Sequence, residues 1–186
     1  MEFLIDLWLP IILSAVFVFL ASTVLHMVVQ IHKNDAGQLP DEDGLAAAMR
    51  ANPPTPGEYY MPYCASMKEL DSEEMKRKYR EGPIAWIAVL PPGTNGMARG
   101  LVLWFVYSLI VSIFVAYIAH LALDIAEYSR VFRVTGAIAV SIYGLSSIPN
   151  SVWKGVPWST TFKFFLDGVV YGLVTAGTFG WLWPSS

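Results

Sequence analysis

The sequence predicts an all-α integral membrane protein, with four transmembrane helices and a partly helical loop between the first and the second. Of its 186 residues, 55% are hydrophobic and only 15% are charged, and its mean hydropathy is positive. Ordinary globular domains carry more charge. The charges are also clustered, because none lies between Gly100 and Leu123, and Asp6 is the one charged side chain from Phe3 to Ile31. Runs of about 20 apolar residues suffice to cross a bilayer.

Four spans follow one another along the chain. A first transmembrane helix falls in residues 1–31 (span 4–31), a loop region in 32–99, and a three-helix membrane region in 100–186, with spans at about 100–123, 132–148 and 164–183. Pro10 lies in the first turns of the first span, where a missing N–H is tolerated. The third span is short and ends at Pro149, so it is either a tilted span or a re-entrant segment.

The loop region contains signals for short elements. A helix is expected over 41–50, and another should begin at Asp71, because Glu74 lies three residues later as in a capping box. Gly82 is a plausible end for that second helix. The apolar run 84–90 is too short to span and favours a surface-lying segment or a small strand.

Basic residues predict the orientation of the chain. With four spans, ten of the 12 lysines and arginines fall on the side of the long loop, and only Arg130 and Arg133 fall on the other. The positive-inside rule therefore places the long loop in the cytoplasm and both termini in the periplasm. Six tryptophans near the predicted span ends match an aromatic belt, namely Trp8, Trp104, Trp153, Trp158, Trp181 and Trp183.

Small residues recur every four positions in the last span. They are Gly168, Gly172, Ala176 and Gly180, and on a helix they form one slanting ridge. In lipid, such ridges let two backbones approach closely. The predicted neighbour is either the third span, with its own small residues Ala137, Ser141 and Gly144, or another subunit.

Polar residues at helical spacing predict the faces that point into the bundle. Ser108 and Ser112 lie four apart on the second span, and Asp167 and Tyr171 lie four apart on the fourth. At the cytoplasmic end we expect a polar cluster of His26, Gln30, Asn150, Lys154 and Asp167. It is either a site for a proton, an ion or an anionic headgroup, or a buried polar knot that holds the spans together.

Asp167 is the sharpest candidate in this cluster, because an acidic residue inside a span is a functional hypothesis by default. A structural role is the alternative. The predicted span places Asp167 in the first turns of its helix, where the free N–H groups favour an anion. Lys163, four residues earlier, is a possible ion-pair partner.

Two weaker constellations suggest metal ligands. His120 and Asp124 share a helix face, and with Glu127 they form either a divalent metal site or a hydrogen-bonded pair. Met61, Cys64 and Met67 offer soft ligands for Cu(I), or simply apolar packing. Neither has a second supporting motif, so we expect no metal or other cofactor. With one cysteine, an intramolecular disulfide is impossible.

One set of motifs carries a resemblance. It comprises Asn150-Ser151-Val152-Trp153, Pro157-Trp158-Ser159-Thr160-Thr161, Gly180-Trp181-Leu182-Trp183-Pro184, and the loop strings His32-Lys33-Asn34-Asp35 and Leu39-Pro40-Asp41-Glu42-Asp43. With them the chain resembles uncharacterised bacterial four-span inner-membrane proteins, a family of unknown function. The resemblance implies a bacterial inner membrane and brings no activity, cofactor or catalytic residue.

These observations favour a non-catalytic accessory or self-assembling membrane subunit, in a homo-oligomer or a larger membrane complex in the lipid bilayer. No basic stripe with interleaved aromatics suggests a nucleic-acid partner. One alternative is a small channel or transporter with a polar path near Asp167 and His26. A second is a membrane enzyme acting on a lipid, with His32, Cys64 or the His120–Asp124 pair in the chemistry. The sequence names no substrate, partner or oligomer number.

Overall fold

The chain forms two units that are each compact. The computed structural model describes residues 3–94, 96–124 and 127–184. One unit combines the residues up to Ala36 with those from Gly96 onward, and the other covers Gly37–Asn95. The fold is 70% helical, and four helices among the described residues are long and apolar enough to cross a membrane, which confirms the predicted fold class. They cover Trp8–Val29, Gly96–Ala122, Tyr128–Lys154 and Trp158–Leu182.

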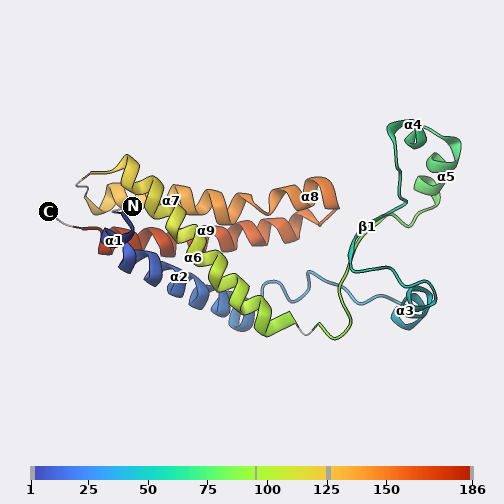
Figure 1. Cartoon of the computed structure of the whole chain (residues 1–186), viewed down its shortest axis with the longest axis horizontal. Helices are drawn as coiled ribbons and strands as arrows, with labels where there is room; N and C mark the ends of the chain where they lie inside the picture. The colour runs from blue at the N-terminus through green and yellow to red at the C-terminus, as the bar shows by residue number, and fades with distance from the viewer. Residues whose placement is uncertain (1–2, 95, 125–126, 185–186) are drawn as a thin grey trace. The chain divides into compact units, whose positions relative to one another are not determined.

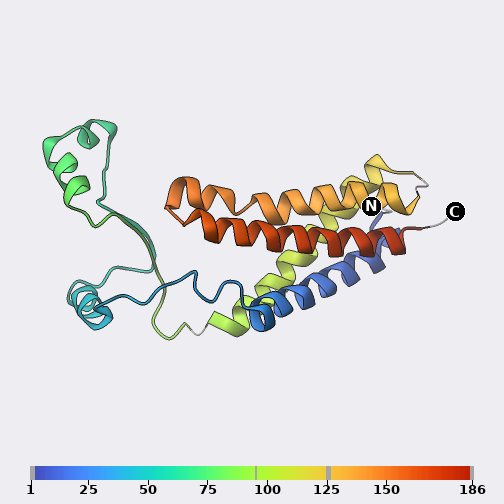
Figure 2. The same cartoon turned by 180° about the vertical axis from the view of Figure 1, so that it is seen from behind.

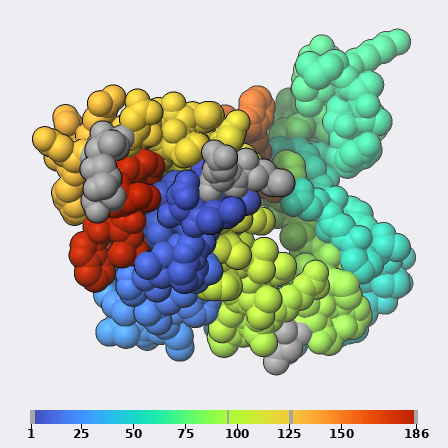
Figure 3. All heavy atoms as spheres, turned by 60° about the vertical axis from the view of Figure 1, so that its left-hand side comes forward, coloured from blue at the N-terminus to red at the C-terminus, as the bar shows by residue number. Residues whose placement is uncertain are grey.

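The first unit is a helical bundle (Figures 1 and 2). In chain order it contains α1 (Phe3–Asp6), α2 (Trp8–Thr23), the π-helix η1 (Val24–Val29), α6 (Gly96–Ala122), α7 (Tyr128–Leu145), α8 (Ile148–Lys154) and α9 (Trp158–Leu182). Helices α7 and α9 lie side by side in both views, and α2 packs on α6 and α9. The space-filling view shows the N-terminal helices packed between α9 and α6 (Figure 3).

The last two spans are longer than the sequence suggests. Pro149 was expected to end the third span, but it lies in the first turn of α8, where its missing N–H costs no hydrogen bond. The fourth span was expected to begin near residue 164, but α9 begins at Trp158, directly after Pro157. The first error arises because proline ends one helix and begins the next equally well.

The bundle interior is mostly apolar toward the end where the N-terminal helix and the end of α9 lie, and the buried hydroxyls there, those of Thr135, Thr175 and Thr178, donate to carbonyls of their own helices. Its core includes Leu7, Ile11, Val115, Val131 and Phe179, all almost fully buried. Large apolar side chains also remain exposed along the spans, as lipid-facing residues of a membrane protein do: Ile12, Leu20, Val102, Phe114 and Leu173.

Buried hydroxyls confirm the predicted inward faces. Ser108 and Ser112 are fully buried, and the Ser112 hydroxyl lies 2.6 Å from that of Ser14 on α2. Trp104, one of the tryptophans near a predicted span end, makes contacts between spans. Its indole N–H donates to the Ser22 hydroxyl at 2.9 Å, and its ring packs against Tyr171 with ring centroids 5.6 Å apart. Trp104 therefore links α6 to α2 and α9.

The glycine ridge of α9 packs against α7 of the same chain. A Cβ added to Gly168 would lie 2.3 Å from the backbone N and Cα of Gly144, and one added to Gly172 would lie 2.3 Å from Val140 Cγ2. Gly136 meets the Cβ of Ala176. The contacting line on α7 is therefore 136, 140 and 144. In the expected line, Gly144 is correct, but Ala137 and Ser141 are exposed.

The second unit is small. It contains α3 (Glu42–Ala51), β1 (Gly57–Met61), α4 (Met67–Leu70), α5 (Glu73–Glu81) and β2 (Ala85–Val89). The apolar run near residues 84–90 forms β2, which pairs antiparallel with β1, with Tyr59 opposite Ile87. This outcome agrees with the strand alternative for that run.

Caps explain the helices of this unit. The Asp41 side chain accepts from the N–H of Gly44 at 2.9 Å and caps α3. Helix α5 is capped by Ser72, which accepts from Met75 N–H, rather than by Asp71 as the capping-box pattern predicted. Serine and aspartate both cap well, so two adjacent candidates left the start ambiguous by one residue. Gly82 ends α5 as expected.

Candidate functional site

Asp167 is a buried carboxylate inside the fourth span. Its residue surface is 2% exposed, and it lies nine residues after Trp158, the first residue of α9. Only the first four backbone N–H groups of a helix lack intrahelical partners. The prediction that a helix N-terminus stabilises Asp167 is therefore wrong, because α9 begins a turn and a half earlier than expected. The carboxylate must find its partners among side chains.

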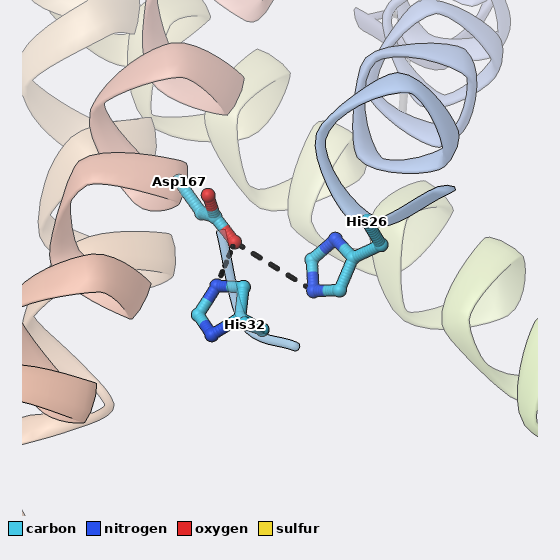
Figure 4. Close-up of side chains that lie close together, drawn as sticks. All are labelled: His26, His32 and Asp167. Atoms are coloured by element: carbon cyan, nitrogen blue, oxygen red, sulfur yellow. Dashed lines mark hydrogen bonds and ion pairs between the residues drawn. The ribbon is translucent and has the colours of Figure 1, made fainter. Parts of the chain in front are cut away.

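Two imidazoles supply those partners (Figure 4). The His32 Nε2 lies 3.0 Å from Asp167 Oδ2, and the His26 Nε2 lies 3.7 Å from the same oxygen. The two rings are stacked, with centroids 4.9 Å apart and planes 11° apart. Phe164 stacks on the other side of His32 at 4.3 Å. Both Nε2 atoms therefore point at one oxygen of a buried carboxylate.

The second nitrogen of each ring is held by an acceptor. His26 Nδ1 lies 3.0 Å from the backbone carbonyl of Ser22, and His32 Nδ1 lies 2.6 Å from Asp35 Oδ2. The Lys163 ammonium donates to the other oxygen of Asp35. That hydrogen bond, together with the one from His32, holds the pKa of the Asp35 carboxyl below its ordinary value. Asp35 is therefore an anion at neutral pH.

These acceptors fix the tautomers. A carbonyl and a carboxylate can only accept, so we assign the imidazole proton to Nδ1 in both His26 and His32. In that tautomer each Nε2 carries a lone pair. In that neutral form two lone pairs and the Asp167 carboxylate oxygen converge on one place, and the arrangement becomes favourable when a positive charge lies there, either as a proton on one Nε2 or as a bound cation.

The backbone at the end of the first span places His32. The turn η1 is a π-helix, in which the Gln30 N–H bonds to Leu25 O at 2.9 Å, five residues back. Gln30 is left-handed, with φ 55°, and reverses the chain. Hydrogen bonds from the Lys33 and Asp35 amides then close a tight turn. His32 is thereby brought back onto His26.

Burial is uneven across the cluster. The side chains of Asp167 and His32 are 3% and 12% exposed, whereas that of His26 is 42% exposed. Two buried oxygens, Asp167 Oδ1 and the Tyr171 hydroxyl one turn further along α9, have no hydrogen-bond partner among the described residues. The site is thus not covered by protein beside His26 and carries unused polar atoms at its buried side.

The structure brings together part of the predicted cluster. His26 and Asp167 meet as described above, and His32 and Asp35 join them. The Gln30 side chain instead donates to the Met27 carbonyl. Asn150 and Lys154 are exposed on α8, where the Asn150 carbonyl accepts from the Val156 amide. Lys163 was expected beside Asp167 but pairs with Asp35.

The other candidate ligands lie elsewhere. His120 is exposed near the far end of α6 with its ring against Phe3, and the Asp124 carbonyl accepts from Trp183. In the second unit, the Cys64 thiol donates to the Ser66 carbonyl at 2.9 Å. Across the described parts of the chain, one group of three histidine, cysteine or acidic ligands has its atoms within 4.8 Å of one another, and it is His26, His32 and Asp167.

His32 and Asp35 were the site residues that the sequence analysis did not place. Both lie outside the apolar run, and His32 was named only as a candidate for lipid chemistry, not as a partner of His26 and Asp167. A usable signal was present, since His32 and Asp35 are three apart and follow the span that carries His26.

Comparison with known proteins gives neither a family nor a function for this chain. The chain matches no protein-family model, no curated protein and no solved structure. The function must therefore be argued from the site itself.

Proposed function

We propose that this chain is a membrane protein that binds a cation in the cluster of His26, His32 and Asp167. One observation carries the proposal: two imidazole nitrogens and a buried carboxylate oxygen converge while the Nδ1 atoms are committed to acceptors. Buried charges in proteins are paired or coordinate metals. Lys163 is taken by Asp35, so the negative charge of Asp167 calls for a bound cation.

The alternative of a neutral polar knot fits these contacts less well. In such a knot one imidazole would donate an Nε2 proton to Asp167. If that imidazole is neutral, its Nδ1 presents a lone pair to the Ser22 carbonyl or to Asp35 at hydrogen-bond distance; if it is an imidazolium, both nitrogens donate and the bound cation is the proton itself. A buried pair of acceptors facing each other is destabilising. A cation at Nε2 removes this conflict for both histidines at once.

A second candidate function, a small transporter, is favoured by the buried hydroxyls. Beyond Asp167, polar groups continue into the bundle through Tyr171 and Ser108 to the hydrogen-bonded pair Ser14 and Ser112. Past them the buried hydroxyls of Thr135, Thr175 and Thr178 donate to carbonyls of their own helices, and the rest of the interior is apolar, around Val115 and Phe179. A carrier closed on one side has this arrangement. Cation flux into liposomes that is lost in Asp167→Asn would support it, and absence of flux in the wild type would exclude it.

We further propose a bacterial inner-membrane location, with the long loop cytoplasmic and both termini periplasmic. The ten-to-two distribution of basic residues supports this orientation. The cluster belongs to the span ends that adjoin the long loop, so the cation would enter from the cytoplasm.

A panel of cations tests the proposed function. The purified chain, in a mild detergent, is melted with Na⁺, K⁺, Mg²⁺, Ca²⁺, Mn²⁺, Co²⁺ or Zn²⁺ added separately. A cation at about 100 times its Kd stabilises the folded state by about 2.7 kcal/mol. We expect at least one cation to raise the melting temperature of the wild type and to lose that effect in Asp167→Asn.

The matched control is His120→Asn, because His120 is the remaining histidine and is exposed near the far end of α6. It should keep the full cation effect. His26→Asn serves as the second test variant, because its side chain is partly exposed and the substitution disturbs packing less than one at Asp167. If no cation stabilises the wild type, or if both site variants respond like the wild type, the proposal is wrong.

A further inference from the structure

We infer that the bound cation is a divalent transition-metal ion such as Zn²⁺ or Co²⁺, held by His26 Nε2, His32 Nε2 and the Asp167 carboxylate. The inference rests on the proposed function and goes further by naming the chemical class of the ion. Four features of the cluster carry it: ligand spacing, ligand type, the partners behind the ligands, and the unused oxygens.

The spacing of the ligand atoms fits one metal ion. Zinc binds histidine nitrogen at about 2.0–2.1 Å in a tetrahedral site, so two ligands of one ion lie about 3.3 Å apart. The Asp167 oxygen lies 3.0 Å from one Nε2 and 3.7 Å from the other. All three ligand atoms are within 4.8 Å of one another. Small ring rotations, easiest at the exposed His26, bring them onto one ion.

The ligand types select the metal class. Ca²⁺ takes six to eight oxygen ligands, and Mg²⁺ is bound through carboxylates, phosphates and water. This cluster offers two imidazoles and one carboxylate. Imidazole suits Zn²⁺ and the neighbouring transition metals. Hard cations therefore find too few oxygens here, whereas borderline metals find their usual nitrogen donors.

The groups behind the ligands are those of a metal site. A metal-binding histidine usually donates its other ring N–H to a carboxylate or a backbone carbonyl, which fixes the ring and raises its basicity. His32 does so to Asp35 and His26 to the Ser22 carbonyl. Lys163 anchors Asp35 in turn. Packing alone does not require both rings to be oriented in this way.

The second oxygen of Asp167 and the open side of the cluster can complete the coordination of the ion. Asp167 Oδ1 is buried without a partner among the described residues, so it is available as a second carboxylate contact or as an acceptor for a metal-bound water. Three protein ligands leave at least one position of the ion unfilled. The exposed side of His26 leaves that position uncovered by other protein atoms.

Direct metal titration tests the inference. The full chain is purified through a tag without histidines, treated with a chelator, and titrated with Co²⁺ followed by visible absorption and with Zn²⁺ followed by calorimetry. We expect one ion per chain and ligand-field bands for Co²⁺. Asp167→Asn and His32→Asn each remove a ligand of the ion, so each should weaken binding more than Asp35→Asn, which removes only the hydrogen-bond acceptor of His32. Asp35→Asn should weaken it about 10- to 100-fold through the orientation of His32.

His120→Asn is again the matched control and should bind like the wild type. Far-UV circular dichroism and the size-exclusion profile establish that each variant is folded, and His26→Asn replaces any that is not. Zn²⁺ binding that survives every site substitution, or that is lost in His120→Asn, would overturn the inference. If Co²⁺ and Zn²⁺ fail to bind but another cation stabilises the chain through Asp167, the metal inference fails and the proposed function stands. If no cation acts, both fail.

Discussion

Replacing Gly168 with alanine tests the close packing of α7 and α9 most directly. The added Cβ would lie 2.3 Å from the backbone N and Cα of Gly144, whereas carbon atoms in contact are about 3.5–4.0 Å apart. The two helices must therefore separate locally by more than about 1 Å. Overpacking an interior costs about 1–3 kcal/mol, and the upper end applies because backbone atoms cannot rotate away.

Alanine also favours the helix over glycine by about 1 kcal/mol, which offsets part of that cost. The net expectation for Gly168→Ala is a loss of about 2 kcal/mol, or about 30-fold in the ratio of folded to unfolded chains. Gly177→Ala is the control, because it lies on the same helix and an added Cβ there meets nothing within 4 Å. It should be neutral or slightly stabilising.

Unfolding in mixed micelles of mild detergent and dodecyl sulfate measures both variants, with helix content followed by circular dichroism. The midpoint of Gly168→Ala should fall well below that of the wild type, while that of Gly177→Ala should not. Equal midpoints for the two variants would mean that α7 and α9 do not touch at Gly168 as described.

Three further predictions follow from the bundle and the loop. Ser112→Ala should cost about 1 kcal/mol, and a double-mutant cycle with Ser14→Ala should give a coupling near 0.6 kcal/mol, typical of hydrogen bonds between spans. Gly172→Leu should impair folding of the single chain through its clash with Val140, so light scattering should show aggregate rather than a dissociated but folded monomer. A membrane-impermeant thiol reagent should label Cys64, the one cysteine, in everted but not right-side-out vesicles if the long loop is cytoplasmic.

Helical periodicity predicted the interior of the bundle well. Ser108, Ser112 and Asp167 are all buried, as their spacing indicates. Lipid offers no partner to polar groups, so most polar residues at one helical spacing face other helices, and the exposed Ser141 instead donates to the Ala137 carbonyl of its own helix. That constraint acts within one helix at a time, and the sequence therefore suffices to predict it.

The partner of the glycine ridge could not be predicted in the same way. The ridge on α9 is visible in the sequence, but which line of α7 meets it depends on how the two helices cross. The contacting residues Gly136 and Val140 are shifted by one position from the expected Ala137 and Ser141. The prediction that the chain assembles with itself or with a partner stays a prediction, but the ridge gives it no support, since α7 of the same chain fills it.

The candidate site was only half predictable for a related reason. His26 and Asp167 lie inside spans, where depth and periodicity bring them to the same region. His32 lies beyond the span, and its position depends on the left-handed conformation of Gln30. A non-glycine residue with positive φ is uncommon and has no clear pattern in a single sequence.

The irregular end of the first span itself favours a bound ligand. A π-helical turn is rare and occurs frequently at functional sites, and the left-handed Gln30 adds a further local cost. A regular α-helix through Ile31 would avoid both costs and would serve equally well as a membrane span. It would also carry His32 along the helix instead of folding it back onto His26. The left-handed Gln30 also ends the helix as an αL cap, and the turn that follows brings His32 onto Asp35, Phe164 and Asp167. A cation held between the two imidazoles and Asp167 would add to the contacts that stabilise this irregular turn.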